Sequence, residues 1–379
     1  MNALPRPLEG VTVLDLTRLL PGPVATMHLA DLGAEVIKIE DPGAGDYARV
    51  MGAMDGPVSV FFKLVNRNKL SLVLDLKDAA DREVLLRLVR TADVLFEGFR
   101  PGVMAKLGLD YATLAGLNPA LVYCSISGFG QTGPYAQRAG HDINYLGYAG
   151  VLDQIGTAGG APALSNLQVA DLLGGALTPL VGVLAALVDA RGRGQGRQVD
   201  VAMTDAVLAH NIFPMAQVLA AGRPTPRGED LLTGGVPCYG VYETRDGRHM
   251  AVGALEAKFW RLTCETLGRP DLVSEHLSEG EAGARARGEV AAIFRGRTLA
   301  EWTALFDPVD CCVTPVLRLD EALHNAQLQA RGMVGEVDGM RQFAPPFGIA
   351  GVDLHGASPA PAPDAHGENL RQRASRIHI

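Results

Sequence analysis

Short apolar runs alternate with amphipathic stretches along the first half of the chain. The runs lie at residues 11–16, 35–39, 71–76, 94–96 and 122–127. A Gly/Pro turn at 21–23 leads into a helical pattern that extends to Asp31, and residues 78–90 form an amphipathic helix pattern. Strands separated by helices predict a parallel sheet with crossover connections. Ligands are then expected at the carboxyl ends of those strands.

A long apolar run at 172–188 interrupts this alternation. It is short for a membrane span, begins near two glycines, contains Pro179 and lies between Asp171 and Asp189. We therefore expect a buried core helix that extends to Ala190. The sequence RGRGQGR at 191–197 follows this helix and lacks the lysine of a phosphate-binding loop, which favours a plain turn.

The pattern changes after residue 200. A helical segment starts at Met203, and residues 221–235 are rich in glycine, proline and charge, which is typical of a linker. Residues 239–244 and 250–252, on either side of Asp246-Gly247, predict a hairpin. Helices are expected at 257–267, 288–294 and 299–305.

Together these patterns predict an α/β fold with two domains, because 379 residues are too many for one small core. Residues 1–200 form a large α/β domain with a doubly wound parallel sheet, and 201–235 form a helical linker. Residues 236–318 form a smaller α+β domain. Residues 319–379 return to complete the large domain, with an extended Pro/Ala-rich stretch at 356–367.

Composition narrows the range of functions. Hydrophobic residues make up 47% and charged residues 20% of the chain, which is ordinary for a folded soluble protein. The formal net charge of −8 argues against a nucleic-acid partner, because phosphate backbones select basic surfaces. The five cysteines are odd in number and lack zinc-finger spacing, and no secretory signal pattern opens the chain. We expect a cytoplasmic protein with reduced thiols and no membrane partner.

Asp171 is an unusual residue because it comes directly before the apolar helix. One interpretation is an N-cap, since a carboxylate there accepts hydrogen bonds from the first backbone N–H groups of a helix. The other is a functional carboxylate at a helix mouth, where Gly174 and Gly175 let a ligand approach. From this residue alone the cap is favoured about two to one.

The sequence GHDINY at 140–145 is the second unusual feature. A neutral imidazole at His141 could act as a base near neutral pH. Alternatively, His141 is a histidine near a helix start that Asp142 caps. The two interpretations are about even.

Several cations follow the predicted strands, where a phosphate-bearing ligand would bind. They are Lys38, Arg67, Lys69, Arg100, Lys106 and Arg138. The turn after the first strand lacks the G-x-G-x-x-G pattern that brings pyrophosphate onto the backbone, which argues against a nicotinamide cofactor.

Taken together, the motifs resemble a known family. The sequences VLDLTR at 13–18, PGP at 21–23, LADLGAEVIK at 29–38, NRNK at 66–69, SGFG at 127–130 and GRQVD at 196–200 are similar to those of family III CoA-transferases. Within that superfamily, GHDINY, LTGG at 232–235, AVGALE at 251–256 and CVTPV at 312–316 resemble the α-methylacyl-CoA racemase branch.

The resemblance implies an interlocked homodimer whose active sites lie between the large domain of one subunit and the small domain of the other. It implies that His141 and Asp171 are catalytic and that Glu256 orients His141 across the subunit interface. The substrate would be an acyl-CoA, with no metal or further cofactor. By the same resemblance, CoA would contact Lys38, Asp41, Val73, Leu74, Asp75, Leu76, Glu97, Gly98, Phe99, Arg100, Gly140, Asp142, Ile143, Asn144 and Tyr145.

Three functions follow from these residues. In a racemase, two bases on opposite faces move the proton α to the thioester, and backbone N–H groups near Asp171 hold the enolate oxygen. In a CoA-transferase, Asp171 attacks the thioester and His141 has no required role. The third function is binding of acyl-CoA without catalysis. Residues 165–170 and 172–175, which flank Asp171, depart from the racemase pattern, so the transferase alternative stays open.

Overall fold

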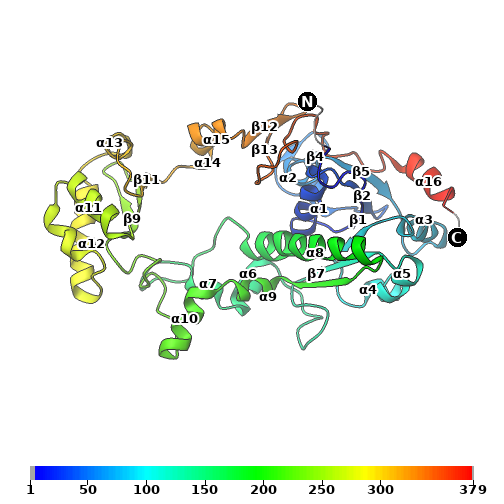
Figure 1. Cartoon of the computed structure of the whole chain (residues 1–379), viewed down its shortest axis with the longest axis horizontal. Coiled ribbons are helices and arrows are strands. Elements are labelled where there is room, and N and C mark those ends of the chain that lie inside the picture. Colours follow the sequence, from blue (N-terminus) through cyan, green and yellow to red (C-terminus); the bar gives the residue numbers. More distant parts are fainter. Residues whose placement is uncertain (1–4, 378–379) are drawn as a thin grey trace. The chain divides into compact units, whose positions relative to one another are not determined.

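The computed structural model describes residues 5–377 and contains a six-stranded parallel sheet (Figure 1). Its strands are β1 (Thr12–Leu16), β2 (Glu35–Glu40), β5 (Lys69–Val73), β6 (Val94–Glu97), β7 (Val122–Ser127) and β8 (Gln198–Ala202). They lie in the order β5-β2-β1-β6-β7-β8. The order reverses between β1 and β6, and ligands of such sheets bind in the crevice at this reversal.

The parallel sheet predicted from the apolar runs is confirmed, with two differences. The predicted strand at 71–76 is β5, which starts two residues earlier because Lys69 and Leu70 already pair with Val36 and Ile37. The apolar pattern did not reveal this start, because the first residue of the strand is a lysine. The sequence pattern did not predict β8, whose polar and apolar residues alternate at the edge of the sheet beside β7.

Helices cover both faces of the sheet. On one face α3 (Ala79–Val89), α5 (Tyr111–Leu117) and α16 (Gly367–Ser375) enclose a core that includes Leu14, Ile37 and Leu95. On the other face α1 (Pro21–Asp31) packs on β1 and β2, and α8 (Thr178–Arg193) packs on β7 and β8. This is the doubly wound arrangement that the alternating pattern predicts.

The predicted helix at 172–190 begins as a π-helical segment, η2 (Ala170–Leu177), and continues as α8. The whole stretch Ala170–Arg193 is long and apolar enough to cross a membrane by length and composition alone. Val183 and Leu187 are buried, but Val181 and Val188 are exposed. The expected buried core helix is therefore confirmed only in part, because one side of it packs on the sheet and the other is exposed. The turn predicted at 191–197 begins only at Gly194, which ends α8 in a left-handed conformation, because residues 191–193 still belong to the helix.

The chain divides into two compact units. The large unit contains the described residues up to Ala149, Asn166–His210 and the residues from Ala326; the small unit contains Gly150–Ser165 and Asn211–Asn325. Residues 150–165 thus belong to the small unit, although the sequence pattern had assigned them to the large domain. The predicted linker at 201–235 is likewise divided, because α9 (Met203–Ala209) packs on η2 and α10 (Ile212–Ala221) belongs to the small unit.

The small unit holds an antiparallel sheet in the order β11-β10-β9. Strands β9 (Tyr239–Glu243) and β10 (His249–Gly253) form the predicted hairpin. Helix α12 (Gly280–Phe294) starts eight residues before the prediction, while α11 (Ala257–Thr266) and α13 (Leu299–Phe306) match it closely. Trp260, Phe294 and Trp302 fill its core.

The remaining described elements are short. They are η1 (Tyr47–Val50), β3 (Met54–Asp55), β4 (Val58–Ser59), α2 (Val60–Val65), α4 (Val103–Lys106), α6 (Asp142–Tyr148), α7 (Val151–Gln154), η3 (Pro270–Glu275), β11 (Val313–Pro315), α14 (Leu319–Ala322), α15 (Ala326–Ala330), β12 (Val334–Val337) and β13 (Met340–Phe343). The Pro/Ala-rich stretch has no regular secondary structure at 357–362 but forms a turn at 363–366 before α16, so the expected extension is only partly confirmed. Ser358 and Asp364 hold the stretch against Asn68 and β5.

Candidate active site

His141 lies at the start of α6, at the end of the loop that follows β7. Its backbone N–H donates to Oδ1 of Asn144 at 3.0 Å, and its side chain is exposed. The expected cap, Asp142, does not serve this helix start; Asn144 does. The imidazole therefore lies at a helix start with open access to solvent, as a proton-transfer group needs.

Tyr145 fixes the loop that carries His141. Its hydroxyl donates to the carbonyl of Gly140 at 2.5 Å. The phenol ring fills the space where a Cβ on Gly128 or Gly140 would lie, at 2.3 and 2.7 Å. Phe129 meets the Tyr145 ring edge-on, with 5.3 Å between the centroids. The two glycines therefore let a buried tyrosine clamp both ends of the loop.

Asp171 is the second residue of η2 and not its N-cap, which is Val169. The cap interpretation is therefore wrong. The cap is provided from α6 instead, because Oδ1 of Asp142 accepts from the backbone N–H groups of Ala170 at 2.7 Å and Asp171 at 3.1 Å. This leaves the Asp171 side chain free of a capping role.

The surroundings of Asp171 favour its protonated form. Its pKa is raised to about 6: burial is the largest cause, the nearby Asp142 carboxylate adds to it, and His141 opposes the increase. His141 and Asp171, 30 residues apart in the sequence, thus lie near enough to interact electrostatically. A carboxyl group with such a pKa can both give and take a proton near neutral pH.

Gly174 and Gly175 allow η2 to pack closely on its neighbours. A Cβ on Gly174 would come within 3.0 Å of the Met203 backbone, and one on Gly175 within 2.4 Å of the Pro21 Cβ. The expectation that these glycines admit a ligand is therefore wrong. They let η2 approach α9 and the turn after β1, and this close packing sets the position of Asp171.

The expected enolate-binding N–H groups near Asp171 are already used. Those of Ala170 and Asp171 bond to Asp142, and that of Leu172 bonds to the Gln168 carbonyl. These three groups therefore stabilise the helix start and are not available to an enolate.

The residues expected to contact CoA lie at the carboxyl ends of β2, β5 and β6 and on α6. Asp41, Gly98, Arg100, Ile143 and Asn144 are exposed there. The side chains of Lys38, Leu74, Glu97 and Tyr145 are buried. Val73, Asp75, Leu76, Phe99, Gly140 and Asp142 are half-buried. The buried side chains support the edge of the sheet, while the exposed ones are open to a ligand.

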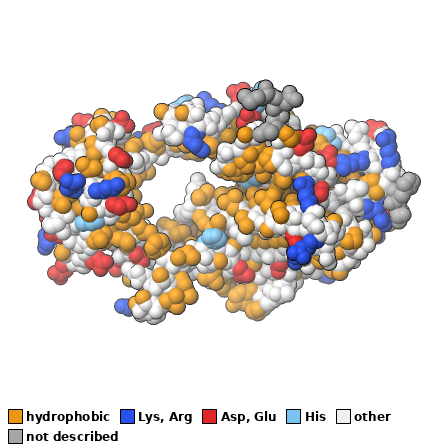
Figure 2. Space-filling model, viewed as in Figure 1, with side chains coloured by type: hydrophobic (Ala, Val, Ile, Leu, Met, Phe, Trp, Pro, Cys, Tyr) orange, Lys and Arg blue, Asp and Glu red, His pale blue; other side chains and the backbone are white. Residues whose placement is uncertain are grey.

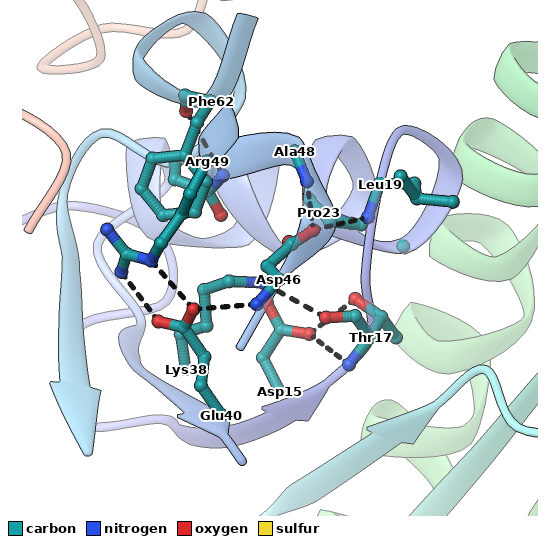
Figure 3. Close-up of polar contacts among 12 residues, drawn as sticks. Asp15, Thr17, Leu19, Pro23, Lys38, Glu40, Asp46, Ala48, Arg49 and Phe62 are labelled. Carbon is teal, nitrogen blue, oxygen red and sulfur yellow. Dashed lines mark hydrogen bonds and ion pairs between the residues drawn. The ribbon is translucent and has the colours of Figure 1, made fainter. Parts of the chain in front are cut away.

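A buried network of charges supports this edge (Figure 3). The Asp15 carboxylate accepts from Thr17, Thr26 and Lys69, and Lys38 pairs with Asp46 at 2.8 Å. Burial alone would raise the pKa of Asp15, but Lys69, Lys38 and the two hydroxyl groups hold it well below its usual range.

The network also fixes the turn that follows β1. Lys38 donates to the carbonyl of Thr17, and Asp46 accepts from the N–H of Leu19, which has a positive φ of 66°. Such a backbone conformation is strained for leucine and persists only where its surroundings hold it. Figure 3 shows the neighbouring pair of Glu40 and Arg49, whose guanidinium lies 3.9 Å from the centroid of a phenylalanine ring.

Three of the six cations proposed for a phosphate are therefore not available. Lys38, Arg67 and Lys69 are buried in ion pairs with Asp46, Asp31 and Asp15. The sequence pattern could not separate these lysines and arginine from exposed ones. Arg100, Lys106 and Arg138 are exposed.

Arg18 is a cation that the sequence reasoning missed. It directly follows the turn-forming Thr17 at the β1/β6 crevice, and its guanidinium carbon lies 5.5 Å from the ring centroids of both Tyr47 and Phe99. Its salt bridge to Asp41 measures 3.4 Å. The sequence could have indicated Arg18, because this arginine comes directly after the first strand.

The small unit holds its own cavity, of about 600 Å³. Three motifs that are distant in the sequence line it, through Leu232 to Gly234, Ala251 to Gly253, and Cys312 with Thr314. Glu256 precedes α11 in the same unit, and its side chain is exposed.

Comparisons with known proteins agree with this geometry. A model of CoA-transferase family III matches residues 8–367. Alpha-methylacyl-CoA racemase of Homo sapiens is 39% identical over 327 residues, which cover 86% of this chain and 81% of the racemase. Acetyl-CoA:oxalate CoA-transferase of Acetobacter aceti is 34% identical over 373 residues, which cover 97% of this chain and 95% of the transferase.

Among solved structures, a CAIB/BAIF family protein from Brucella suis matches with a TM-score of 0.86 and 29% identity. The match covers 98% of this chain and 100% of that protein. The parallel sheet and its helices are therefore those of an established enzyme family, and the chain belongs to CoA-transferase family III.

Proposed function

We propose that this enzyme is a racemase that interconverts the (2R) and (2S) epimers of 2-methylacyl-CoA thioesters. The observation that carries the proposal is the proximity of His141 to Asp171, whose pKa is raised to about 6, mainly by burial. A reversible two-base reaction needs two groups that exchange a proton readily in both directions, and these two groups meet that requirement.

In one direction, neutral His141 takes the proton from the α-carbon and the thioester becomes an enolate. Protonated Asp171 then gives its proton to the opposite face of the same carbon, which inverts the centre. In the other direction the Asp171 carboxylate takes the proton and the imidazolium of His141 returns one. Each group is expected to contribute about 10²- to 10⁴-fold to the rate.

CoA is proposed to lie across the β1/β6 crevice. Parallel sheets of this order bind ligands at that point, and the half-buried Arg18 and the exposed Arg100 can pair with its phosphates. The cavity in the small unit, which is lined mostly by apolar and small residues, is proposed to take part of the acyl group. The proton transfers use no cofactor beyond the CoA of the substrate.

The enzyme is also proposed to form a homodimer in which Glu256 orients His141 of the partner copy. Helix α10 supports a self-associating surface, because Ile212, Phe213, Met215 and Leu219 are all exposed on it. Figure 2 shows hydrophobic side chains on the surface over this helix. Apolar surfaces of this kind mark interaction sites. The five unpaired cysteines support a reducing compartment, the cytoplasm.

CoA transfer between carboxylic acids is the second candidate. The transferase of Acetobacter aceti covers more of this chain than the human racemase does, 97% against 86%. In this mechanism the Asp171 carboxylate attacks the thioester, forming a mixed anhydride and then an aspartyl-CoA thioester, and an acceptor acid collects the CoA.

One experiment separates the two candidates. The enzyme is incubated with a 2-methylacyl-CoA in D₂O without an acceptor acid, and the α-hydrogen is followed by NMR. Deuterium wash-in with epimerisation is expected. No wash-in, but CoA transfer once a carboxylic acid is added, would replace the racemase with the transferase. Binding without either reaction would leave an acyl-CoA-binding protein.

A further inference from the structure

Asp142 is linked to both proposed catalytic residues. In the sequence it directly follows His141, and in space its Oδ1 accepts from the N–H groups of Ala170 at 2.7 Å and Asp171 at 3.1 Å. One carboxylate therefore joins the start of α6 to the start of η2. Hydrogen bonds from backbone N–H groups to a carboxylate are charge-assisted and shorter and stronger than neutral ones.

We propose that Asp142 is a positioning residue that holds the Asp171 carboxyl in place relative to His141 through the backbone at Ala170 and Asp171. This inference rests on the proposed function, in which those two side chains exchange protons with one carbon atom. Asp142 acts through Asp171, because its Oδ1 accepts from both N–H groups.

The same carboxylate also acts on Asp171 as a charge. It lies close enough to raise the Asp171 pKa, in addition to the larger effect of burial. The groups that alter this pKa, Asp142 and His141, both come from the start of α6, and the Tyr145 phenol also lies nearby. The other elements packed on η2 contact it through the uncharged residues Pro21 and Met203. Asp142 is thus the negative charge that keeps the Asp171 proton available near neutral pH.

Two substitutions distinguish the positioning role of Asp142 from the effect of its charge. Asp142→Asn keeps an oxygen that can accept from Ala170 and Asp171 but removes the charge. Asp142→Ala removes both. Asp78→Asn is a matched control, because Asp78 caps α3 through the N–H groups of Ala80 and Asp81 and lies outside the site.

The expected results differ between the variants. Asp142→Ala should lower kcat by about 10- to 100-fold with little change in KM, because small displacements of a reacting group have effects of this size. Asp142→Asn should recover most of kcat, while its pH–rate profile moves toward acid because the Asp171 pKa falls. A titration of the Asp171 carboxyl by ¹³C NMR should move in the same direction. Asp78→Asn should leave the profile unchanged.

The inference is overturned if Asp142→Asn keeps the wild-type pH profile, or if Asp142→Ala keeps the wild-type kcat. A purely structural role would lower the melting temperature and kcat together without moving the profile. If Asp142→Ala does not fold, the profile of Asp142→Asn decides alone. If wild-type enzyme shows CoA transfer and no wash-in, the racemase proposal fails, and the same variants test the positioning of Asp171 on the transfer rate.

Discussion

The two proposed catalytic side chains differ in their environment. His141 is exposed, whereas Asp171 is half-buried and has a pKa raised to about 6. An aspartate of ordinary pKa would be almost wholly deprotonated near neutral pH and would rarely carry the proton that the enolate must receive. Burial raises the pKa of Asp171, which increases the fraction of the carboxyl that holds a proton near neutral pH.

A pH prediction follows from this pair. The active form carries one proton shared between His141 and Asp171, so kcat/KM should follow a bell-shaped curve with two macroscopic pKa values. Activity falls on the acid side as both groups become protonated, near or below pH 6, and on the alkaline side as both lose their proton. Because epimerisation takes up no net proton, both directions must give the same curve. Initial rates with each epimer from pH 5 to 9 check this; a curve without an acid limb near or below pH 6 would contradict the role of Asp171.

Substitution of His141 is the sharpest test of its role. His141→Ala should lower epimerisation by about 10²- to 10⁴-fold, since one of the two bases is lost. CoA binding, measured by calorimetry, should stay close to wild type, because the backbone bond to Asn144 remains. His355→Ala, at another exposed histidine, is the control. Full activity of His141→Ala would refute the mechanism.

The elements around the site are held together by close packing rather than by the apolar pattern alone. The π-helical η2 carries Asp171 and packs on α1, α6 and α9. Such segments occur frequently at functional sites. Its two glycines allow the contacts with Pro21 and Met203 that bring η2 to the turn after β1.

Gly175 therefore tolerates no side chain. Gly175→Ala should lower the free energy of unfolding by about 1–3 kcal/mol, because the new methyl group would lie 2.4 Å from the Pro21 Cβ. Gly192→Ala is the control: the same substitution in α8 meets nothing within 4 Å and should stabilise by up to about 1 kcal/mol. Urea denaturation of both variants measures the difference. Equal effects would mean that the packing of η2 does not depend on Gly175.

The buried network beneath the crevice should be equally sensitive. Asp15→Asn leaves the Lys69 charge buried without its ion-pair partner, so it should cost about 3–5 kcal/mol of stability. Asp189→Asn removes an exposed carboxylate that pairs with two arginines and should leave the melting temperature nearly unchanged. Thermal denaturation compares the two. If the two variants have the same melting temperature, the network does not stabilise this edge of the sheet.

For the whole molecule, the two units carry different parts of the proposed site. His141 and Asp171 belong to the large unit, while Glu256 and the 600 Å³ cavity belong to the small unit. The proposed dimer would let the units of two copies complete one another. It also explains why α10 has no buried residue in the single chain.

Light scattering should therefore give a mass of twice 40.0 kDa for the enzyme in solution. Phe213→Asp combined with Leu219→Asp should weaken the dimer and reduce activity with it, because both side chains are exposed on α10. Val188→Asp, on the exposed side of α8, tests whether any apolar surface has this effect. A fully active monomer would contradict the proposed dimer.

Much of the fold follows from local patterns in the sequence. The apolar runs predict five of the six parallel strands, and the hairpin and helices of the small unit follow from turn residues and periodicity. The starts of β5 and η2 were misplaced because a buried lysine and a buried aspartate look polar in any local window. Their partners lie far away in the sequence, at Asp15 and Asp142.

His141 and Asp171 could be singled out from the sequence because ionisable residues beside apolar segments are conspicuous. Their relation could not, because their distance, the burial of Asp171 and the hydrogen bonds of Asp142 arise only when α6 packs on η2. Residue type and order therefore set which groups are available and which elements form. The three-dimensional packing decides which cations remain exposed, what the glycines accommodate and how strongly Asp171 holds its proton, because solvent exclusion and charge act through space.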